Sequence, residues 1–332
     1  MFRNKTILIT GGTGSWGRKL AEALLEEHPK ELRILSRNEY AQVLMKRELH
    51  QDPRLRFVIG DIRDYEAVEE ACHKVDYLFH LAALKHVDIC EEQPSEALKT
   101  NVLGTENIIR ASIKQRVKKV INVSTDKAVD PMNTYGLTKA LGEKLMIRAN
   151  LLTDRTRFVC VRGGNVLGTS GSVVPLFLDQ IRKGKEVTIT HHEMTRFFLT
   201  ITEAIRLLVI VAKESVGGET FVMKMKACRI VDLAKVLMKL SGGKSLPFQE
   251  IGMRPGERLD ELLISKNEVP YTRQFSEQYY MILPSSSVYG KYERYAHLNK
   301  VAFEEYHSNT ELMDEEAIAE LLREGGYKWE IV

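Results

Sequence analysis

The chain has 332 residues, of which 44% are hydrophobic, and a formal net charge of +3. This length fits one large or two modest domains, and the apolar content is ample for a buried core. Lys and Arg are interspersed with Asp and Glu, so the charge pattern gives no reason to expect binding to nucleic acid or to an anionic membrane.

The cysteines and the apolar runs indicate the cellular compartment in which the protein is expected. Four cysteines lack the paired spacing of a metal site or a disulfide framework, so we expect buried thiols, no metal and a reducing compartment; they are Cys72, Cys90, Cys160 and Cys228. The apolar run 207–212 is too short to span a bilayer, and the first strand begins too early to leave room for a signal peptide. We therefore expect a cytoplasmic protein.

The amino terminus predicts a nucleotide-binding turn. The β-branched run Thr6–Thr10 leads into glycines spaced G-x-x-G-x-x-G, and apolar residues then recur at helical spacing. A strand, a tight glycine turn and a helix amino terminus together bring backbone N–H groups to a pyrophosphate. We expect the cofactor to contact Gly11, Thr13, Gly14, Ser15, Trp16 and Gly17.

The second strand, Leu32–Ser36, bears on which dinucleotide is bound. A site specific for NAD usually has an acidic residue at this strand end, whereas this chain continues with Arg37, which suits a 2′-phosphate. We therefore expect NADP, although the nearby Glu39 keeps NAD open. The alternative for Arg37 is a solvated loop cation.

Two further strands extend the pattern. Residues 57–64 predict a third strand, with Asp61 able to contact adenine or cap the next helix, and Asp64 better suited to the cap. Residues 75–83 predict a fourth strand in which Ala82 and Ala83 let the backbone lie against the nicotinamide half of a cofactor. His80 in this strand is expected to be buried rather than catalytic.

The most reactive side chains follow a buried strand, 120–123. Thr125, Asp126 and Lys127 come directly after it, and Tyr135 and Lys139 are spaced to share one face of a helix. The Lys139 ammonium is expected to lower the pKa of the phenol, which could then take a proton from a sugar alcohol. The alternative is a surface helix carrying an amphipathic tyrosine.

The alternation of strands and helices, with a sixth strand at 158–162, predicts an α/β fold with a Rossmann-like doubly wound parallel sheet. After about residue 165 the alternation loosens, although 173–182 predicts a helix with Pro175 in its first turn. We expect a cofactor-binding domain at 1–165 and a smaller, mainly substrate-binding lobe at 166–332, with segments around 195–222 returning to the first domain.

Several motifs together resemble the extended short-chain dehydrogenase/reductases, and more narrowly the inverting UDP-N-acetylglucosamine 4,6-dehydratases of bacterial surface-sugar pathways, including the pseudaminic acid route. The resemblance runs from residue 5 to about 265, and its discriminating detail is Thr-Asp-Lys where retaining dehydratases carry Thr-Asp-Glu. The motifs are 10–17, 82–87, 124–128, Tyr135 with Lys139, 164–166, 171–175, 194–197 and 254–257.

This resemblance implies a reaction and a set of roles. Tyr135, assisted by Lys139 and Thr125, would take the C4 hydroxyl proton; a neutral Lys127 would remove the C5 hydrogen, and Asp126 would protonate the leaving C6 hydroxyl. Inversion at C5 and return of hydride to C6 would complete the reaction on a UDP-sugar. Further implied contacts are Ile62 and Lys85 for the cofactor, and Lys85, Asn165, Arg196, Arg254 and Glu257 for the substrate, with Arg254 as a diphosphate clamp.

The chain departs from this family near the chemistry. Gly163 stands where a tyrosine is usual, Ser170 where an arginine is usual, and Asn38 where an aspartate is usual. An alternative activity is therefore C5 epimerisation of a 4-keto-6-deoxy or 5,6-ene sugar nucleotide made by a partner enzyme. A second alternative is a non-catalytic NADP-binding regulator, against which the intact acid and base argue. We also expect a homo-oligomer.

Overall fold

The protein is described by a computed structural model covering residues 1–168, 172–242, 245–284 and 290–327. Within these residues the largest sheet has nine strands in the order β14-β15-β10-β6-β5-β4-β1-β2-β3. The strands from β3 to β10 pair in parallel, whereas β15 and β14 are antiparallel at one edge. Their bounds are β1 (Thr6–Thr10), β2 (Glu31–Ser36), β3 (Leu55–Ile59), β4 (Tyr77–His80), β5 (Lys119–Thr125), β6 (Arg157–Gly163), β10 (Thr220–Met223), β14 (Thr272–Gln274) and β15 (Tyr279–Ile282).

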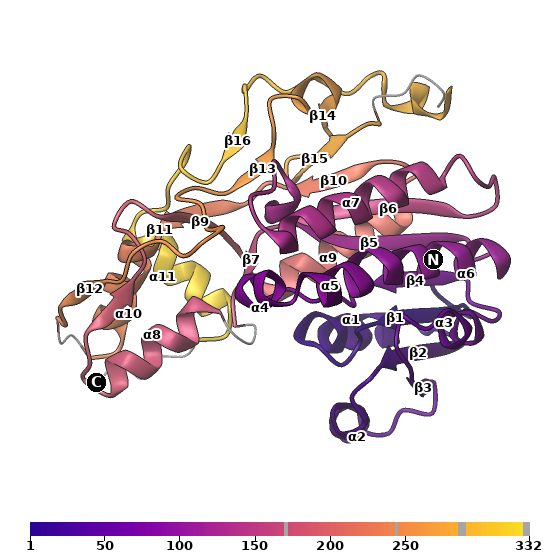
Figure 1. Ribbon diagram of the computed structural model, residues 1–332, viewed down its shortest axis with the longest axis horizontal. Coiled ribbons are helices and arrows are strands. Elements are labelled where there is room, and N and C mark those ends of the chain that lie inside the picture. The colour runs from indigo at the N-terminus through magenta and orange to yellow at the C-terminus, as the bar shows by residue number, and fades with distance from the viewer. Residues whose placement is uncertain (169–171, 243–244, 285–289, 328–332) are drawn as a thin grey trace.

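Helices cover both faces of this sheet (Figure 1). Helices α1 (Ser15–Glu26) and α9 (Ile201–Glu214) pack together on one face, where they contribute apolar side chains to the largest core cluster. On the other face lie α3 (Tyr65–Ala71), α6 (Gly104–Lys114) and α7 (Thr134–Ala149), with a second core cluster beneath them. Helices on both faces of a mostly parallel sheet confirm the predicted doubly wound α/β fold.

Shorter elements complete this part of the chain. Helix α2 (Glu39–Glu48) lies beside β2 and β3, and Asp64 caps α3 by accepting from the backbone N–H of Glu66 and Ala67, as predicted. Between β4 and α6 the chain forms α4 (Val87–Glu92), α5 (Pro94–Ala97) and a π-helical stretch, Leu98–Leu103. A short 3₁₀ turn, η2 (Asp126–Ala128), follows β5 and carries the reactive pair predicted from the sequence.

A third apolar core lies to one side of the large sheet (Figure 1). It is built by α8 (Val173–Arg182), α10 (Ile230–Leu240) and α11 (Glu315–Glu324). Two small sheets border it, β7 (Asn165–Val166) with β9 (Thr195–Leu199) and β11 (Lys226–Arg229), and β8 (Val187–Ile189) with β12 (Phe248–Glu250). The pair β13 (Leu262–Ile264) and β16 (Tyr306–His307) instead adds apolar side chains to the largest core cluster. The remaining 3₁₀ turns are η3 (Val269–Tyr271) and η4 (Gly290–Tyr295).

The chain crosses back to the large sheet twice after residue 166. Helix α9 and strand β10 form the first return, within the region where one was expected, and β14 and β15 form a second return that the sequence did not predict. These two strands are only three and four residues long, so they leave little periodic pattern. The third strand ends at Ile59, before the acidic turn, and the fourth ends at His80, earlier than the predicted 83.

Burial agrees with several further predictions. His80 is buried and bonded to Thr10 Oγ1 and Thr105 Oγ1, and burial lowers its pKa to about 3. All four cysteines are buried and unpaired, as expected for core thiols. Among the described residues, no helix combines the length and apolar character needed to cross a bilayer.

Candidate active site

The glycine turn between β1 and α1 is shaped by close backbone contacts. Gly11 adopts φ +67°, and a Cβ there would lie 2.8 Å from the backbone of Ala82. A Cβ on Gly17 would lie 2.3 Å from the carbonyl oxygen of Gly12. Gly14 is the N-cap of α1, so no side chain covers the first N–H groups of this helix. The turn therefore leaves an open, electropositive helix end of the kind that binds phosphate groups.

A cavity of about 590 Å³ begins at this turn and runs along the carboxyl ends of β1, β4, β5 and β6. It brings together most of the predicted cofactor residues with four of the predicted catalytic ones, whereas Asp126 lies outside its lining. Those lining it are Gly11, Gly14, Ser15, Trp16, Gly17, Ala82, Ala83, Lys85, Thr125, Lys127, Tyr135, Lys139 and Asn165. Partial burial lowers the pKa of Lys85.

The other predicted cofactor residues lie outside the lining of this cavity. Thr13 accepts a hydrogen bond from Arg18 Nε through its carbonyl oxygen, 3.0 Å away, and Ile62 is buried in the core beneath α3. Arg37 is 55% exposed, with Nη1 3.8 Å from Asp61 Oδ2. Partial burial opposes ionisation of Asp61, but hydrogen bonds from Arg63 lower its pKa below the usual value. Arg37 is thus loosely held at the end of β2, beside Asp61.

Tyr135 and Lys139 lie on α7, whose N-cap Asn133 accepts from the Gly136 N–H. Burial raises the pKa of Tyr135 to about 12, and the charge that opposes this most belongs to Lys127. Lys139 instead donates to the Val123 carbonyl oxygen at 2.7 Å, and burial lowers its own pKa. The charge that most favours the phenolate is therefore that of Lys127, rather than the Lys139 ammonium expected from the sequence.

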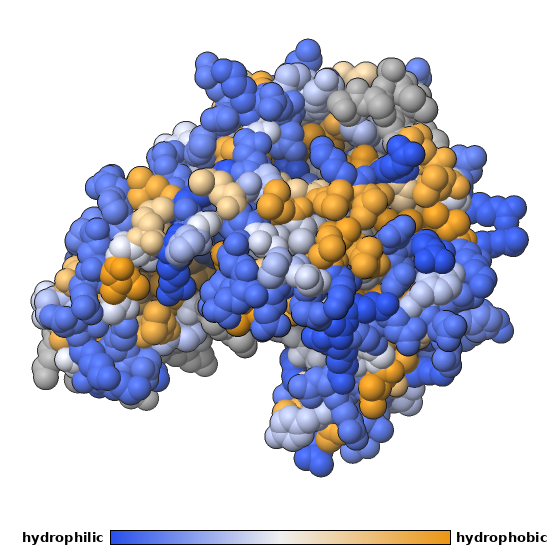
Figure 2. Space-filling model, in the orientation of Figure 1, coloured by the Kyte–Doolittle hydropathy of each residue, from blue (hydrophilic) through white to orange (hydrophobic). Residues whose placement is uncertain are grey.

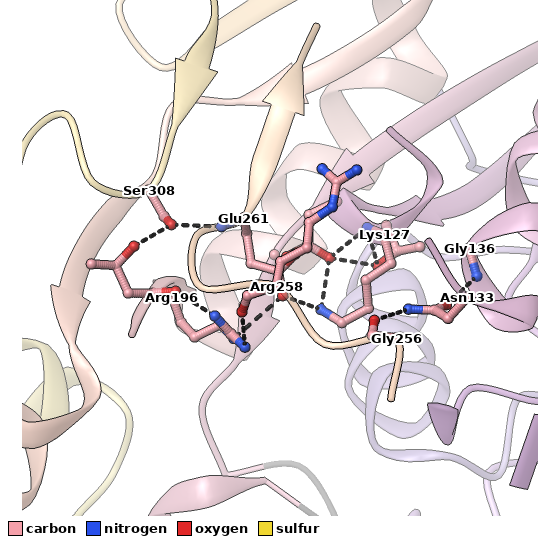
Figure 3. A network of polar contacts seen from close by, with 12 residues as sticks. Lys127, Asn133, Gly136, Arg196, Gly256, Arg258, Glu261 and Ser308 are labelled. Carbon is pink, nitrogen blue, oxygen red and sulfur yellow. Dashed lines mark hydrogen bonds and ion pairs between the residues drawn. The ribbon is translucent and has the colours of Figure 1, made fainter. Parts of the chain in front are cut away.

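Lys127 lies between two carboxylates (Figure 3). Its Nζ is 3.1 Å from Asp126 Oδ1 and 3.1 Å from Glu261 Oε1. Burial alone would lower the pKa of Lys127, but these two carboxylates outweigh it and raise the pKa above the ordinary lysine value. The two carboxylates favour the charged ammonium over the neutral amine that the resemblance implies, and one of them, Glu261, is a counterion that the local sequence does not reveal.

Asp126 is more deeply buried than its neighbour. Its Oδ1 accepts from Thr125 Oγ1 at 2.7 Å, while Oδ2 is buried with no hydrogen-bond partner among the described residues. Burial raises the pKa of Asp126, the Lys127 charge lowers it, and Glu261 adds to the rise. A carboxyl group in this setting takes up a proton more readily than an exposed aspartate.

A second cavity of about 540 Å³ opens on the other side of Lys127. Lys85, His86, Lys127 and Asn165 line both cavities, so the two meet at the reactive pair. The predicted substrate residues Arg196, Arg254 and Glu257 line the second cavity. Glu257 Oε2 also accepts from the Arg254 backbone N–H at 3.0 Å, which holds the loop that carries both side chains.

Arg196 is already engaged within the protein. Its guanidinium donates to the carbonyl oxygens of Thr195, Arg258 and Leu259, and its Nε lies 3.3 Å from Glu261 Oε1. The side chain is buried, so it supports the cavity wall and presents little surface to a ligand. Arg254 is the exposed guanidinium on this wall.

Of the two departures nearest the chemistry, only Gly163 can be placed. It lines the first cavity, and a Cβ there would meet Met223 Sδ and Trp16 Cη2 at 4.0 Å, an ordinary contact distance. Ser170 lies outside the described residues. Sequence reasoning missed Glu261. Its only local signal is that it follows the motif at 254–257 by four residues.

Comparison with known proteins places this arrangement in a family. Residues 7–283 match the family model described as "Polysaccharide biosynthesis protein". The chain belongs to this family. The match extends beyond residue 265, where the sequence resemblance was expected to fade.

Individual relatives and solved structures agree with this assignment. An uncharacterised membrane protein of Methanocaldococcus jannaschii is 44% identical, over 85% of this chain and 87% of its own. A UDP-glucose 4-epimerase of Rickettsia canadensis is 42% identical, over 97% and 96%. The crystal structure of Pen from Bacillus thuringiensis has a TM-score of 0.90 at 36% identity, covering 97% of this chain and 99% of that one. The dTDP-glucose 4,6-dehydratase DesIV of Streptomyces venezuelae, with NAD and TYD bound, has a TM-score of 0.70 at 25% identity, covering 76% and 86%.

Proposed function

We propose that this protein is a nucleotide-sugar 4,6-dehydratase acting on UDP-N-acetylglucosamine with inversion at C5. The observation that carries the proposal is the contact between Asp126 and Lys127 at the junction of the two cavities, beside Tyr135. Oxidation and reduction at C4 need only one proton acceptor for the hydroxyl. Elimination of water across C5 and C6 needs a base and an acid as well, and this pair can supply both.

The first cavity fits a nicotinamide dinucleotide, because its glycine turn has the close backbone approach and the uncovered helix end that a pyrophosphate requires. Gly11, Gly14, Ser15 and Trp16 would hold the pyrophosphate end, and Ala82, Ala83, Tyr135 and Lys139 the nicotinamide end. When bound, the cofactor supplies reversible hydride acceptance. Relatives in the solved structures that carry NAD support this assignment.

Tyr135 is placed to take the proton of the C4 hydroxyl, with Thr125 and the Lys127 charge favouring its phenolate form. Lys127 must lose a proton before it can act as a base. Asp126 Oδ1 lies 3.1 Å from its Nζ, and burial makes this carboxylate a good proton acceptor. One transfer along this contact breaks an N–H bond, forms an O–H bond and yields both the neutral amine and the carboxylic acid.

The amine would then remove the C5 hydrogen, which an adjacent C4 ketone makes acidic, and Asp126 would protonate the departing C6 hydroxyl. With the hydride returned to C6, delivery of a proton to the opposite face of C5 completes the reduction of the double bond and gives inversion. The sugar nucleotide would lie in the second cavity, with Arg254 on the diphosphate and Lys85, Asn165 and Glu257 around the sugar. Arg196 would support the wall of this cavity rather than contact the sugar nucleotide directly.

A second candidate is 4-epimerisation, which the name of the 42%-identical relatives supports. Incubating the protein with UDP-N-acetylglucosamine and following the product mass separates the two. Loss of one water supports the dehydratase, whereas an unchanged mass with inverted C4 supports the epimerase. If the compound is untouched but a supplied 4-keto-6-deoxy sugar nucleotide exchanges its C5 hydrogen with solvent, the protein is a C5 epimerase. Binding without any of these changes supports a regulator.

For the cofactor we infer NADP from Arg37. If its guanidinium binds the 2′-phosphate, Arg37→Ala should weaken NADP binding by about 1.5–3 kcal/mol, the range for a charged hydrogen bond, and leave NAD binding unchanged. Titration calorimetry with both dinucleotides measures this difference. Equal weakening of both would reject the assignment.

The homo-oligomer remains part of the proposal. Leu137 and Leu141 on α7, with Leu98 and Leu103 in the adjoining π-helical stretch, are exposed large apolar side chains. Figure 2 shows apolar surface gathered on this face of the molecule. A patch of this kind suits a second copy of the chain. Light scattering should give a smaller molar mass for the double variant Leu137→Glu with Leu141→Glu than for the wild type.

A further inference from the structure

We propose that Glu261 is a positioning residue for Lys127, holding its ammonium group against Asp126 from the opposite side of the active site. The role of Lys127 as a base rests on the proposed function. The contacts of Glu261 and the experiment that tests them need only the folded protein, without substrate. Glu261 belongs to none of the groups predicted from the sequence.

The Glu261 carboxylate is fixed from several directions (Figure 3). The residue is only 3% exposed. Its Oε1 forms ion pairs with Lys127 Nζ, 3.1 Å away, and with Arg196 Nε, 3.3 Å away. Its backbone N–H donates to Ser308 Oγ at 2.8 Å, and its carbonyl oxygen accepts from the Ser308 N–H at 2.9 Å. Ser308 Oγ also bonds Thr195 Oγ1 at 2.6 Å, so the backbone that carries Glu261 is tied to β9.

Four groups face the Lys127 amine from the surrounding elements. Asp126 lies on η2, Tyr135 on α7, Arg196 on β9 and Glu261 before β13. The two carboxylates stabilise the ammonium and Arg196 destabilises it. Without Glu261, Lys127 would face the Arg196 charge with Asp126 as its remaining counterion. The ammonium would then lose its proton more readily.

Glu261 also links the two cavities mechanically. It ends a segment, 254–261, that lines the second cavity. This segment is held against the loop 129–133, which joins η2 to α7. In this segment Gly256 accepts through its carbonyl oxygen from Asn133 Nδ2 at 2.8 Å, and the Arg258 guanidinium donates to the Asp130 carbonyl oxygen. The base is therefore held partly by the wall of the substrate cavity.

The test measures the proton affinity of Lys127 without substrate. Trace labelling with acetic anhydride across a pH series, read by peptide mass spectrometry, reports the fraction of Lys127 present as free amine. Normalising each curve to its own plateau removes differences in access. In Glu261→Gln the labelling midpoint should fall, and each unit of fall makes labelling about tenfold faster at a fixed lower pH. The smaller change Glu261→Asp should shift the midpoint in the same direction by less.

The matched control is Asp260→Asn, which removes the adjacent carboxylate that bonds Thr195 and Asn309 rather than Lys127. Its midpoint should equal that of the wild type. An unchanged midpoint in Glu261→Gln, or an equal shift in the control, would overturn the proposal. If Glu261→Gln does not fold, an unchanged midpoint in Glu261→Asp would overturn it instead. Because no sugar nucleotide is used, failure of the dehydratase assignment would show separately, as unchanged UDP-N-acetylglucosamine with the wild type.

Discussion

Two buried charge clusters adjoin α7, and they differ in how completely their charges are satisfied. In one, Arg162 donates to both Glu143 and Glu268, with its Nη2 2.6 Å and 2.8 Å from the two carboxylates, and also to the Leu263 carbonyl oxygen. In the other, Lys127 lies between Asp126 and Glu261 on the cavity wall, and Asp126 Oδ2 has no partner among the described residues. The first cluster is closed, whereas the second has capacity left for a ligand.

The difference follows from the cation in each cluster. A guanidinium presents a fixed fork of donors that two carboxylates can fill, and it does not release a proton at accessible pH. An ammonium is a compact charge on a flexible stem whose pKa responds to its surroundings. The arginine cluster therefore suits structural support, linking α7 to the segment before η3. The lysine cluster suits proton transfer.

The largest expected effect breaks the lysine cluster. Lys127→Met keeps the length of the side chain but removes the amine, so water loss from UDP-N-acetylglucosamine should fall by about 10²–10⁴-fold, the usual contribution of a positioned base. The variant should still fold, because Asp126, whose pKa is raised by burial, can take up a proton once the amine is gone, and Glu261 retains Arg196. Product analysis by mass spectrometry measures the rate, with the exposed Lys99→Met as control. Undiminished turnover would remove Lys127 from the mechanism.

Breaking the arginine cluster should instead affect folding. Arg162→Met leaves Glu143 and Glu268 without their shared cation, and an uncompensated buried charge costs about 3–5 kcal/mol of unfolding free energy. Chemical denaturation followed by circular dichroism gives this value. A loss below about 1 kcal/mol would show that this cluster is not the structural one.

A smaller effect, with a defined pH dependence, comes from one carboxylate of the same cluster. Burial opposes ionisation of Glu268, but Arg162 lowers its pKa below the usual value. A lowered pKa gives stability that is complete above the unfolded value, about 4.3, and is lost as the pH falls through the folded value. Glu268→Gln should therefore cost about 1–3 kcal/mol at pH 7, and less as the solution is acidified. A cost independent of pH would contradict the ion pair.

The sequence predicted the parts of the site that are local in the chain. Glycine spacing after a buried strand identified the turn at 11–17, and the strand before Ser124 placed Asp126, Lys127 and Tyr135 at one sheet edge. The fold class followed from the alternation of elements. These predictions rest on the local pattern of single strands, turns and helices and on their order along the chain, where periodicity and turn chemistry are informative.

The electrostatic state of the site was not predictable in the same way. Glu261 reaches Lys127 from a distant segment and favours its charged form, and Lys139 donates to a strand carbonyl. The engagement of Arg196 with three backbone carbonyls likewise depends on tertiary packing. Such contacts have no signature in the spacing of residues, so the chemical groups could be named but not their charges.

The central claim is that the Asp126–Lys127 pair acts at C5 of the sugar. It is tested most directly by running the wild-type reaction on UDP-N-acetylglucosamine in deuterium oxide and examining the product by NMR. The dehydratase account predicts a product that has lost water and carries a solvent-derived deuterium at C5, because the hydrogen removed there is replaced by a proton from solvent. A product that keeps its original C5 hydrogen would contradict it.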